Sequence, residues 1–331
     1  MTVTVYGAGA IGGVTGAALA RAGRDVLLVD QVVDHVAAMN SRGLTIETRD
    51  GAWRTPVRAV TPDALGGPLD LVLLAVKAHS TDAALHVIEG RLAPGGAVVS
   101  LQNGLNEERI AARIGAARTV GCLVNWAADW LAPGVIQHGG DGAFVVGELD
   151  GTPSPRVREL ADLLGAATPT RVSDNVWGLK WSKHVYEVVE RGPAVGRMLV
   201  DLVAEGMTVA KASGVRLEPF DEFDPAWYWA AAAGDEPQAR HAMKTIAAHY
   251  RTHTKTKTGI WRDLAVRKRK TEVEAHLGAT IAKAEAAGVA VPLIRRLLDL
   301  IGELETGRRA MAWANLDELV TLDAATRGRA R

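Results

Sequence analysis

The stretch that most constrains the fold is the glycine-rich opening of the chain, TVTVYGAGAIGGVTGAALARAG, residues 2–23. Within it, Val3–Tyr6 predicts a short buried strand, and Ile11–Ala22 predicts a helix rich in alanine and leucine. The segment GAGAIG, residues 7–12, stands at the joint between them. A strand, a glycine-rich loop and a helix in this order predict the first unit of a parallel α/β sheet.

Each glycine of this joint has a physical role. Gly7 permits a tight turn, Gly9 lets a pyrophosphate approach the backbone, and Gly12 allows close contact between helix and strand. The N-terminus of the helix then faces the anion. The alternative is that the glycines serve helix packing alone. We predict that the loop binds the phosphates of a dinucleotide through Gly7, Gly9, Ala10, Ile11 and Gly12.

An acidic residue follows the next predicted strand and bears on the choice of cofactor. Asp25–Val29 predicts that strand, and Asp30 ends it, about 20 residues after the glycines. A carboxylate at this place can bind both ribose hydroxyls of NAD and repels the 2′-phosphate of NADP. No arginine occurs in residues 31–34. The sequence therefore favours NAD(H) over NADP(H), unless Asp30 is only an exposed acid at a strand end.

The alternation of strands and helices continues. An apolar strand at Leu69–Val76 ends at Lys77, and a second at Ala97–Leu101 is followed by Asn103. The carboxyl ends of parallel strands form the edge where ligands bind. Further strands and one helix are predicted at Thr119–Val124, Val135–His138, Ala143–Val146 and Arg156–Leu164.

The pattern changes to helices from about residue 175. We therefore predict the α/β class, with a Rossmann-type doubly wound sheet followed by an all-helical C-terminal domain. Residues 1–170 are predicted to form the NAD(P)-binding domain and residues 171–331 the substrate and catalytic domain. The helical segments are predicted at 175–191, 197–213, 237–255, 260–287 and 293–306.

Composition excludes several classes of function. The chain has 331 residues, 48% of them apolar, which supports a large core, but no apolar run is long enough to span a membrane. Cys122 is the only cysteine, which excludes an internal disulfide and a multi-cysteine metal site. The 38 basic and 38 acidic residues balance, so no global field favours nucleic acid or a membrane. We expect a cytoplasmic protein that acts on a small molecule.

Two features outside the sheet carry weaker signals. His249 and His253 have the spacing of a metal pair, but no nearby glutamate completes the HExxH pattern, so no metal site is predicted. The run WYWAAAAG, Trp227–Gly234, is aromatic and apolar. It is expected to lie in the core or at a subunit interface, although it could also form the wall of a substrate pocket. We expect a homodimer.

One helical segment carries a stripe of charge. Lys183, Glu187 and Arg191 recur every fourth residue in NVWGLKWSKHVYEVVERG, residues 175–192. A solvated, salt-bridged helix face would explain this spacing. The other explanation is chemical, because an ammonium group can stabilise the charge that develops on a carbonyl oxygen during hydride transfer and donate a proton to it.

A series of motifs extends along most of the chain in a specific order: GAGAIGG at 7–13, VKA at 76–78, LQNG at 101–104, WSK at 181–183, and TEVE at 271–274 followed by GVAVP at 288–292. In this order they resemble the ketopantoate reductases (2-dehydropantoate 2-reductases). The resemblance implies an N-terminal Rossmann domain, a helical C-terminal domain, and hydride transfer from a nicotinamide to a 2-oxo acid in the cleft between them.

The resemblance also implies roles for single residues. Lys183 matches the family's catalytic lysine, and Lys77 and Asn103 match cofactor and active-site contacts. Glu272 matches a carboxylate on the substrate side. Glu187, one helical turn after the lysine, is expected to face the substrate as well, where the family carries asparagine.

The chain also departs from the family pattern. Arg191 replaces a second asparagine, Thr258 and Gly259 replace a serine pair, and the segment after Lys183 is shorter. Two hypotheses follow. The first is an NAD(P)H-dependent oxidoreductase of a 2-oxo or 2-hydroxy acid or a related alcohol, with Lys183 as general acid and base. The second is a dinucleotide-binding redox sensor or degenerate relative without turnover.

Overall fold

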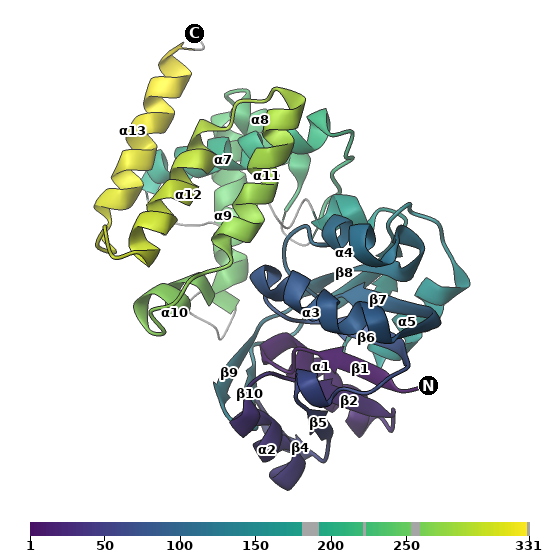
Figure 1. Ribbon diagram of the computed structural model, residues 1–331. Coiled ribbons are helices and arrows are strands. Elements are labelled where there is room, and N and C mark those ends of the chain that lie inside the picture. Colours follow the sequence, from purple (N-terminus) through teal and green to yellow (C-terminus); the bar gives the residue numbers. More distant parts are fainter. Residues whose placement is uncertain (181–191, 221–222, 253–258, 330–331) are drawn as a thin grey trace. The chain divides into compact units, whose positions relative to one another are not determined.

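The computed structural model of the protein describes residues 1–180, 192–220, 223–252 and 259–329 (Figure 1). The chain divides into two compact units, Met1–Trp177 and Gly178–Arg331. The first is an α/β unit, and the second is helical. Among the described residues, no helix is both long and apolar enough to cross a membrane.

The first unit is built on an eight-stranded sheet in the order β12-β11-β8-β7-β6-β1-β2-β5. The six strands from β8 to β5 are all parallel, whereas β11 pairs antiparallel with β8 and parallel with β12. This architecture, followed by a helical unit, confirms the predicted fold class. The strands are β1 (Val3–Tyr6), β2 (Val26–Val29), β5 (Arg58–Val60), β6 (Leu69–Leu74), β7 (Leu92–Ser100), β8 (Thr119–Asn125), β11 (Ala143–Glu148) and β12 (Thr170–Val172).

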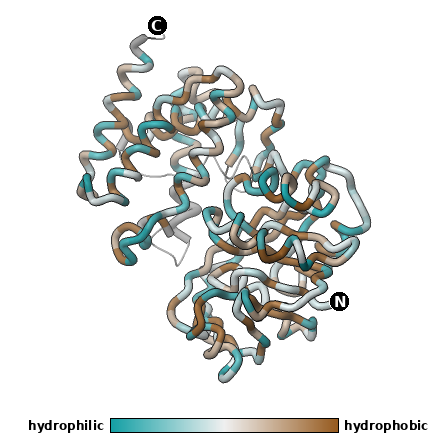
Figure 2. The backbone as a smooth tube through the Cα atoms, in the orientation of Figure 1, coloured by the Kyte–Doolittle hydropathy of each residue, from teal (hydrophilic) through white to brown (hydrophobic). Residues whose placement is uncertain are grey.

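Helices cover both faces of this sheet because successive strand residues point to opposite sides. In β1, Val5 packs in one cluster with α1 (Ala10–Arg21), α2 (Val33–Arg42) and α5 (Pro155–Gly165). Its neighbour Tyr6 packs in another cluster with α3 (Thr81–Ile88) and α4 (Glu107–Ile114). The central strands are therefore mostly apolar, as Figure 2 shows for the interior of this unit.

A second, four-stranded sheet accompanies the first and was not predicted. Its order is β4-β3-β10-β9. It lies against α1, where a Cβ at Gly13 would come within 2.2 Å of Cδ1 of Ile136. Gly13 thus lets the helix and this sheet pack closely. The strands are β3 (Leu44–Thr48), β4 (Gly51–Thr55), β9 (Ala128–Ala132) and β10 (Val135–His138).

In the second unit, one predicted helix differs from the structure. The single helix predicted over 260–287 is two helices, α10 (Gly259–Ala265) and α11 (Val273–Ala287). Between them Lys268 adopts a φ of 49°. The buried carboxylate of Asp263 accepts from Arg267 and Arg269 at 3.1 and 2.9 Å, and these bonds fold the chain back on itself. The other described helices are α7 (Gly192–Ala212), α8 (Pro225–Ala232), α9 (Glu236–Thr252), α12 (Pro292–Glu305) and α13 (Ala314–Arg329).

The aromatic run of α8 has a mixed environment. Tyr228 is fully buried and stacks against Phe223 at 5.0 Å between ring centroids. Trp229 is 37% exposed, and the ammonium group of Lys211 lies 5.6 Å from the centre of its ring. Within its own unit, Tyr228 and Ala231 of this run are buried, whereas Trp229, Ala233 and Gly234 are exposed.

Candidate functional site

The three glycines of the loop differ in what surrounds them. Gly7 has a φ of 101°, and a Cβ there would lie 2.8 Å from the backbone nitrogen of Val76. At Gly12 a Cβ would lie 2.1 Å from the carbonyl oxygen of Gly7. At Gly9, by contrast, a Cβ would meet no atom within 4 Å. The fold therefore accounts for Gly7 and Gly12, while the space at Gly9 is open to a ligand.

The N-terminus of α1 opens beside this space. The helix begins at Ala10, with Gly9 as a cap that offers no side chain, and no acidic residue stands in the first turn. Its first bond joins the N–H of Gly13 to the carbonyl of Gly9 at 2.8 Å. The N–H groups before Gly13 have no partner inside the helix, and the helix dipole adds positive charge. The partly exposed Ala10 and Ile11 can therefore present N–H groups to an anion.

Asp30 lies at the same edge of the sheet. The N–H of Gly7 donates to the carbonyl of Val29 at 2.8 Å, which joins the loop to the end of β2. Asp30 follows directly, half-buried, and its Oδ1 accepts from the N–H of Val32 at 2.9 Å. This bond orients the carboxylate at the end of β2.

Lys77 and Asn103 are both exposed at the ends of neighbouring parallel strands, β6 and β7. The buried Gln102 joins the two strand ends. Its Nε2 donates to the carbonyl of Val76 and to Oγ1 of Thr81, each at 2.9 Å. The structure therefore brings the glycine loop, Asp30, Lys77 and Asn103 to one edge of the sheet, as the strand pattern predicted.

Two further side chains, neither of them predicted from the sequence, hold these loops in place. Nδ2 of Asn106 donates to the carbonyl of Asn103 at 2.7 Å. Nη1 of Arg109 donates to the carbonyl of Ala78 at 3.2 Å, and its other nitrogen pairs with Asp82. These bonds link α4 and α3 to the loops that carry Asn103 and Lys77.

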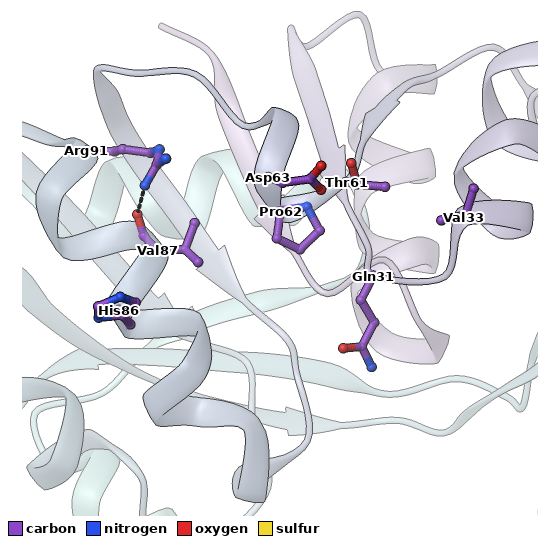
Figure 3. Close-up of a pocket in the computed structure, with 8 residues that line it drawn as sticks. All are labelled: Gln31, Val33, Thr61, Pro62, Asp63, His86, Val87 and Arg91. Atoms are coloured by element: carbon purple, nitrogen blue, oxygen red, sulfur yellow. Dashed lines mark hydrogen bonds between the residues drawn. The ribbon is translucent and has the colours of Figure 1, made fainter.

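A depression of about 530 Å³ begins beside Asp30 and was not predicted (Figure 3). Gln31 and Asp63 come from the loops after β2 and β5 and line one side. Val87 and Arg91 line the other, where Nη1 of Arg91 donates to the carbonyl of Val87 at 2.7 Å. Gln31 directly follows Asp30 in the chain, so one wall of the depression comes from the loop after β2.

Glu272 belongs to the second unit and stands at the N-terminus of α11. It is 9% exposed, and its Oε1 lies 3.9 Å from Nε2 of His276, one turn along the helix. The preceding Thr271 is held by Glu305, whose Oε1 accepts from its N–H and its hydroxyl at 2.8 and 2.6 Å. The backbone is thus fixed at the helix entry.

Several predicted residues fall elsewhere. Lys183, Glu187 and Arg191 lie outside the described residues, as do Thr258 and His253. Gly259 is the first residue of α10. Within the part of the chain that the structure describes, no group of three or more His, Cys, Asp or Glu side chains is arranged to hold a metal ion.

Comparison with known proteins shows which family the chain belongs to. The family model for ketopantoate reductase PanE/ApbA matches residues 3–151, and the model for its C-terminal region matches residues 182–305. A 2-dehydropantoate 2-reductase of Halobacterium salinarum is 30% identical over 320 residues, covering 91% of this chain and 98% of that protein. The chain belongs to the ketopantoate reductase family. As a ketopantoate reductase family member, it is an oxidoreductase of the class that acts on a CH–OH group with a nicotinamide dinucleotide.

Other relatives agree with this assignment. A 2-dehydropantoate 2-reductase of Pyrococcus abyssi is 29% identical over 329 residues. The crystal structure of a PanE/ApbA family ketopantoate reductase from Ralstonia eutropha JMP134 superposes with a TM-score of 0.77 at 29% identity, covering 94% of this chain and 100% of that one. D-mandelate dehydrogenase, solved with NADH and anilino(oxo)acetate, has a TM-score of 0.75 at 22% identity, covering 96% and 99%, and shares the fold.

Proposed function

We propose that this ketopantoate reductase family member uses NAD(H) to interconvert a 2-oxo acid and its 2-hydroxy acid, or a related alcohol, with Lys183 as general acid and base. The observation that carries the proposal is the open space at Gly9 beside the uncapped N-terminus of α1. A pyrophosphate fits there because backbone N–H groups and the helix dipole both favour an anion.

The adenosine end of the cofactor is assigned to the neighbouring strand end. Asp30 would accept hydrogen bonds from the ribose hydroxyls, and the depression that begins at Gln31 would receive the adenine ring. The Asp30 carboxylate opposes a 2′-phosphate. This charge therefore favours NAD(H) over NADP(H).

The bound cofactor supplies or accepts the hydride, and the chain's own residues handle charge and position. Lys77 and Asn103 would orient the nicotinamide end at the strand ends that carry them. The Lys183 ammonium group would stabilise the negative charge that develops on the carbonyl oxygen and donate a proton to that atom. In the reverse direction it accepts the proton from the hydroxyl. Glu187 and Glu272 would bind polar groups of the substrate.

The two units have different roles in this proposal. The first unit holds the dinucleotide, and the second contributes Lys183, Glu187 and Glu272 to substrate binding and chemistry.

We also propose a cytoplasmic homodimer. Among the relatives of known structure, a ketopantoate reductase from Staphylococcus aureus is described as dimeric. Light scattering on the purified chain tests the assembly directly.

The test of the function is a screen of 2-oxo and 2-hydroxy acids with NADH, NADPH and their oxidised forms. For a substrate that turns over, Lys183→Ala should lower kcat by about 10² to 10⁴ while NADH affinity stays nearly constant. Lys244→Ala, on an exposed position of α9, is the matched control and should leave both unchanged.

Two results would refute this assignment. A kcat that survives Lys183→Ala within about threefold, against the 10²-fold loss expected of a general acid, would place the proton donor elsewhere. Tight NADH binding without turnover of any acid or alcohol would favour the non-catalytic redox sensor.

A further inference from the structure

We propose that His35, a buried residue of α2, is a positioning residue that sets the orientation of the dinucleotide loop. The inference rests on the proposed function of that loop. The His35 side chain is 0% exposed, and both of its ring nitrogens are in contact with backbone groups. Its Nε2 lies 2.9 Å from the carbonyl oxygen of Ala8, and its Nδ1 lies 2.9 Å from the backbone nitrogen of Gly134.

The partners of His35 define where its proton lies. The backbone N–H of Gly134 is a donor, so Nδ1 must accept. The indole Nε1 of Trp130, also a donor, lies 3.4 Å from the same Nδ1. The carbonyl of Ala8 is an acceptor, so Nε2 must carry the hydrogen and donate it. The ring is therefore held as the neutral Nε2–H tautomer, with one nitrogen bonded to the hairpin of β9 and β10 and the other to the loop.

The bond to Ala8 controls the peptide that follows it. The C=O of Ala8 and the N–H of Gly9 belong to one planar trans peptide, in which the two bonds point in opposite directions. Because the C=O points at the buried His35 ring, the N–H of Gly9 points away from it. The preceding Gly7–Ala8 peptide is held as well, because the N–H of Ala8 donates to the carbonyl of Val29 at 3.0 Å. His35 holds the Ala8–Gly9 peptide itself, and we infer that it aims the Gly9 N–H at the pyrophosphate position.

The other side of the ring is anchored to a rigid turn. Gly134 has a φ of 76°, and a Cβ there would lie 3.1 Å from Cβ of Ala38 on α2. Nη2 of Arg42, at the end of the same helix, donates to the carbonyl of Pro133 at 3.4 Å. The hairpin turn is therefore packed against α2, which holds the His35 ring in its plane.

Two substitutions each remove one of the two hydrogen bonds that the His35 ring makes with the backbone. The side-chain nitrogen of glutamine reaches the place of Nε2, so His35→Gln keeps a donor for Ala8 and loses the acceptor for Gly134. The side-chain oxygen of asparagine reaches the place of Nδ1, so His35→Asn keeps the acceptor and loses the donor. Each variant forfeits one buried hydrogen bond and some volume, so both should lower the melting temperature by similar amounts.

The readout is the NADH dissociation constant from fluorescence titration, together with KM and kcat in the reductase assay. His35→Gln should bind NADH within about twofold of the wild type, whereas His35→Asn should weaken binding by about fivefold or more, the loss that one hydrogen bond predicts. At saturating NADH, kcat should change little in either variant. Trp130→Phe, which removes only the weaker contact to Nδ1, is the control and should leave NADH affinity unchanged.

Equal NADH affinity in the two His35 variants would overturn the inference and leave the proposed function intact. A wild-type protein that binds neither NADH nor NADPH would overturn both. The tautomer provides a test that needs no substitution. Nitrogen chemical shifts of His35 in the wild-type protein should report a proton on Nε2, and a proton on Nδ1 would refute the arrangement.

Discussion

The carbonyl oxygen of Gly7 lies 2.1 Å from the position that a Cβ would occupy at Gly12. A side chain at Gly12 would therefore collide with backbone that cannot move aside. At Gly9 the same addition meets nothing within 4 Å, and the backbone there is extended, with a φ of −67°. One short motif thus contains a glycine whose Cβ position is filled by backbone and a glycine whose Cβ position is open.

This contrast gives a matched pair of variants. Gly12→Ala should lower the free energy of unfolding by about 1 to 3 kcal/mol, the cost of forced overpacking. Gly9→Ala should leave it within about 0.5 kcal/mol and weaken NADH binding by about tenfold, because the methyl group occupies the approach of the pyrophosphate. Urea denaturation and NADH titration measure the two effects. Unchanged NADH affinity in Gly9→Ala would remove the pyrophosphate from this loop.

Asp30 gives a prediction about the choice of cofactor. The wild-type protein should bind NADH more tightly than NADPH, because the carboxylate accepts from the ribose hydroxyls and repels a 2′-phosphate. Asp30→Ala should narrow the difference by weakening NADH binding and relieving the repulsion of NADPH. Parallel titrations with the two cofactors test this. Equal or tighter binding of NADPH by the unmodified chain would contradict it.

Glu205 of α7 has an unusually high pKa for a carboxyl group. Its two oxygens accept from the N–H groups of Leu293 and Ile294, each at 2.9 Å, at the start of α12. Burial raises its pKa to about 7, with Asp323 and Asp201 adding to the rise and the two N–H groups opposing it. The folded state therefore holds this proton more strongly than the unfolded chain does.

The pH dependence of stability follows from that direction. The contribution of Glu205 is complete below its ordinary pKa of 4.5 and is lost as the pH rises through about 7. Between about pH 5 and pH 8 the wild type should lose about 2 kcal/mol of unfolding free energy relative to Glu205→Gln, which cannot titrate there. Denaturation of both proteins across this range measures the difference. A difference that stays constant with pH would show that the carboxyl group is not perturbed.

Glu187 is predicted to set the acidity of the proposed proton donor. It stands four residues after Lys183, the spacing at which side chains on a helix meet, and a carboxylate beside an ammonium group raises the pKa of that group. Glu187→Gln should therefore lower the Lys183 pKa and move the pH profile of kcat toward acid. Profiles of both proteins over the same buffers are the measurement. A shift toward base would exclude a charge pairing between the two residues.

The local pattern was sufficient for much of the first unit. Val3–Tyr6 forms a strand, α1 begins one residue from its predicted start, and Lys77 and Asn103 lie on one edge, because parallel strands place their carboxyl ends together. The pattern failed at the break between α10 and α11, because apolar periodicity continues through that segment. The chain leaves the helix there at Lys268, whose φ is 49°, and Arg269 donates back to the buried Asp263 six residues earlier.

By itself, the sequence determined the glycine loop, the change from alternating strands and helices to helices alone, and the family, because those depend on residue type and spacing along the chain. Only the tertiary structure decided which of these glycines has backbone against its Cβ position, where the depression at Gln31 lies, and what holds the loop. His35 meets Ala8 and Gly134 across 27 and 99 residues of chain. Such bonds arise only when helix, loop and hairpin pack together and exclude water from the polar groups between them.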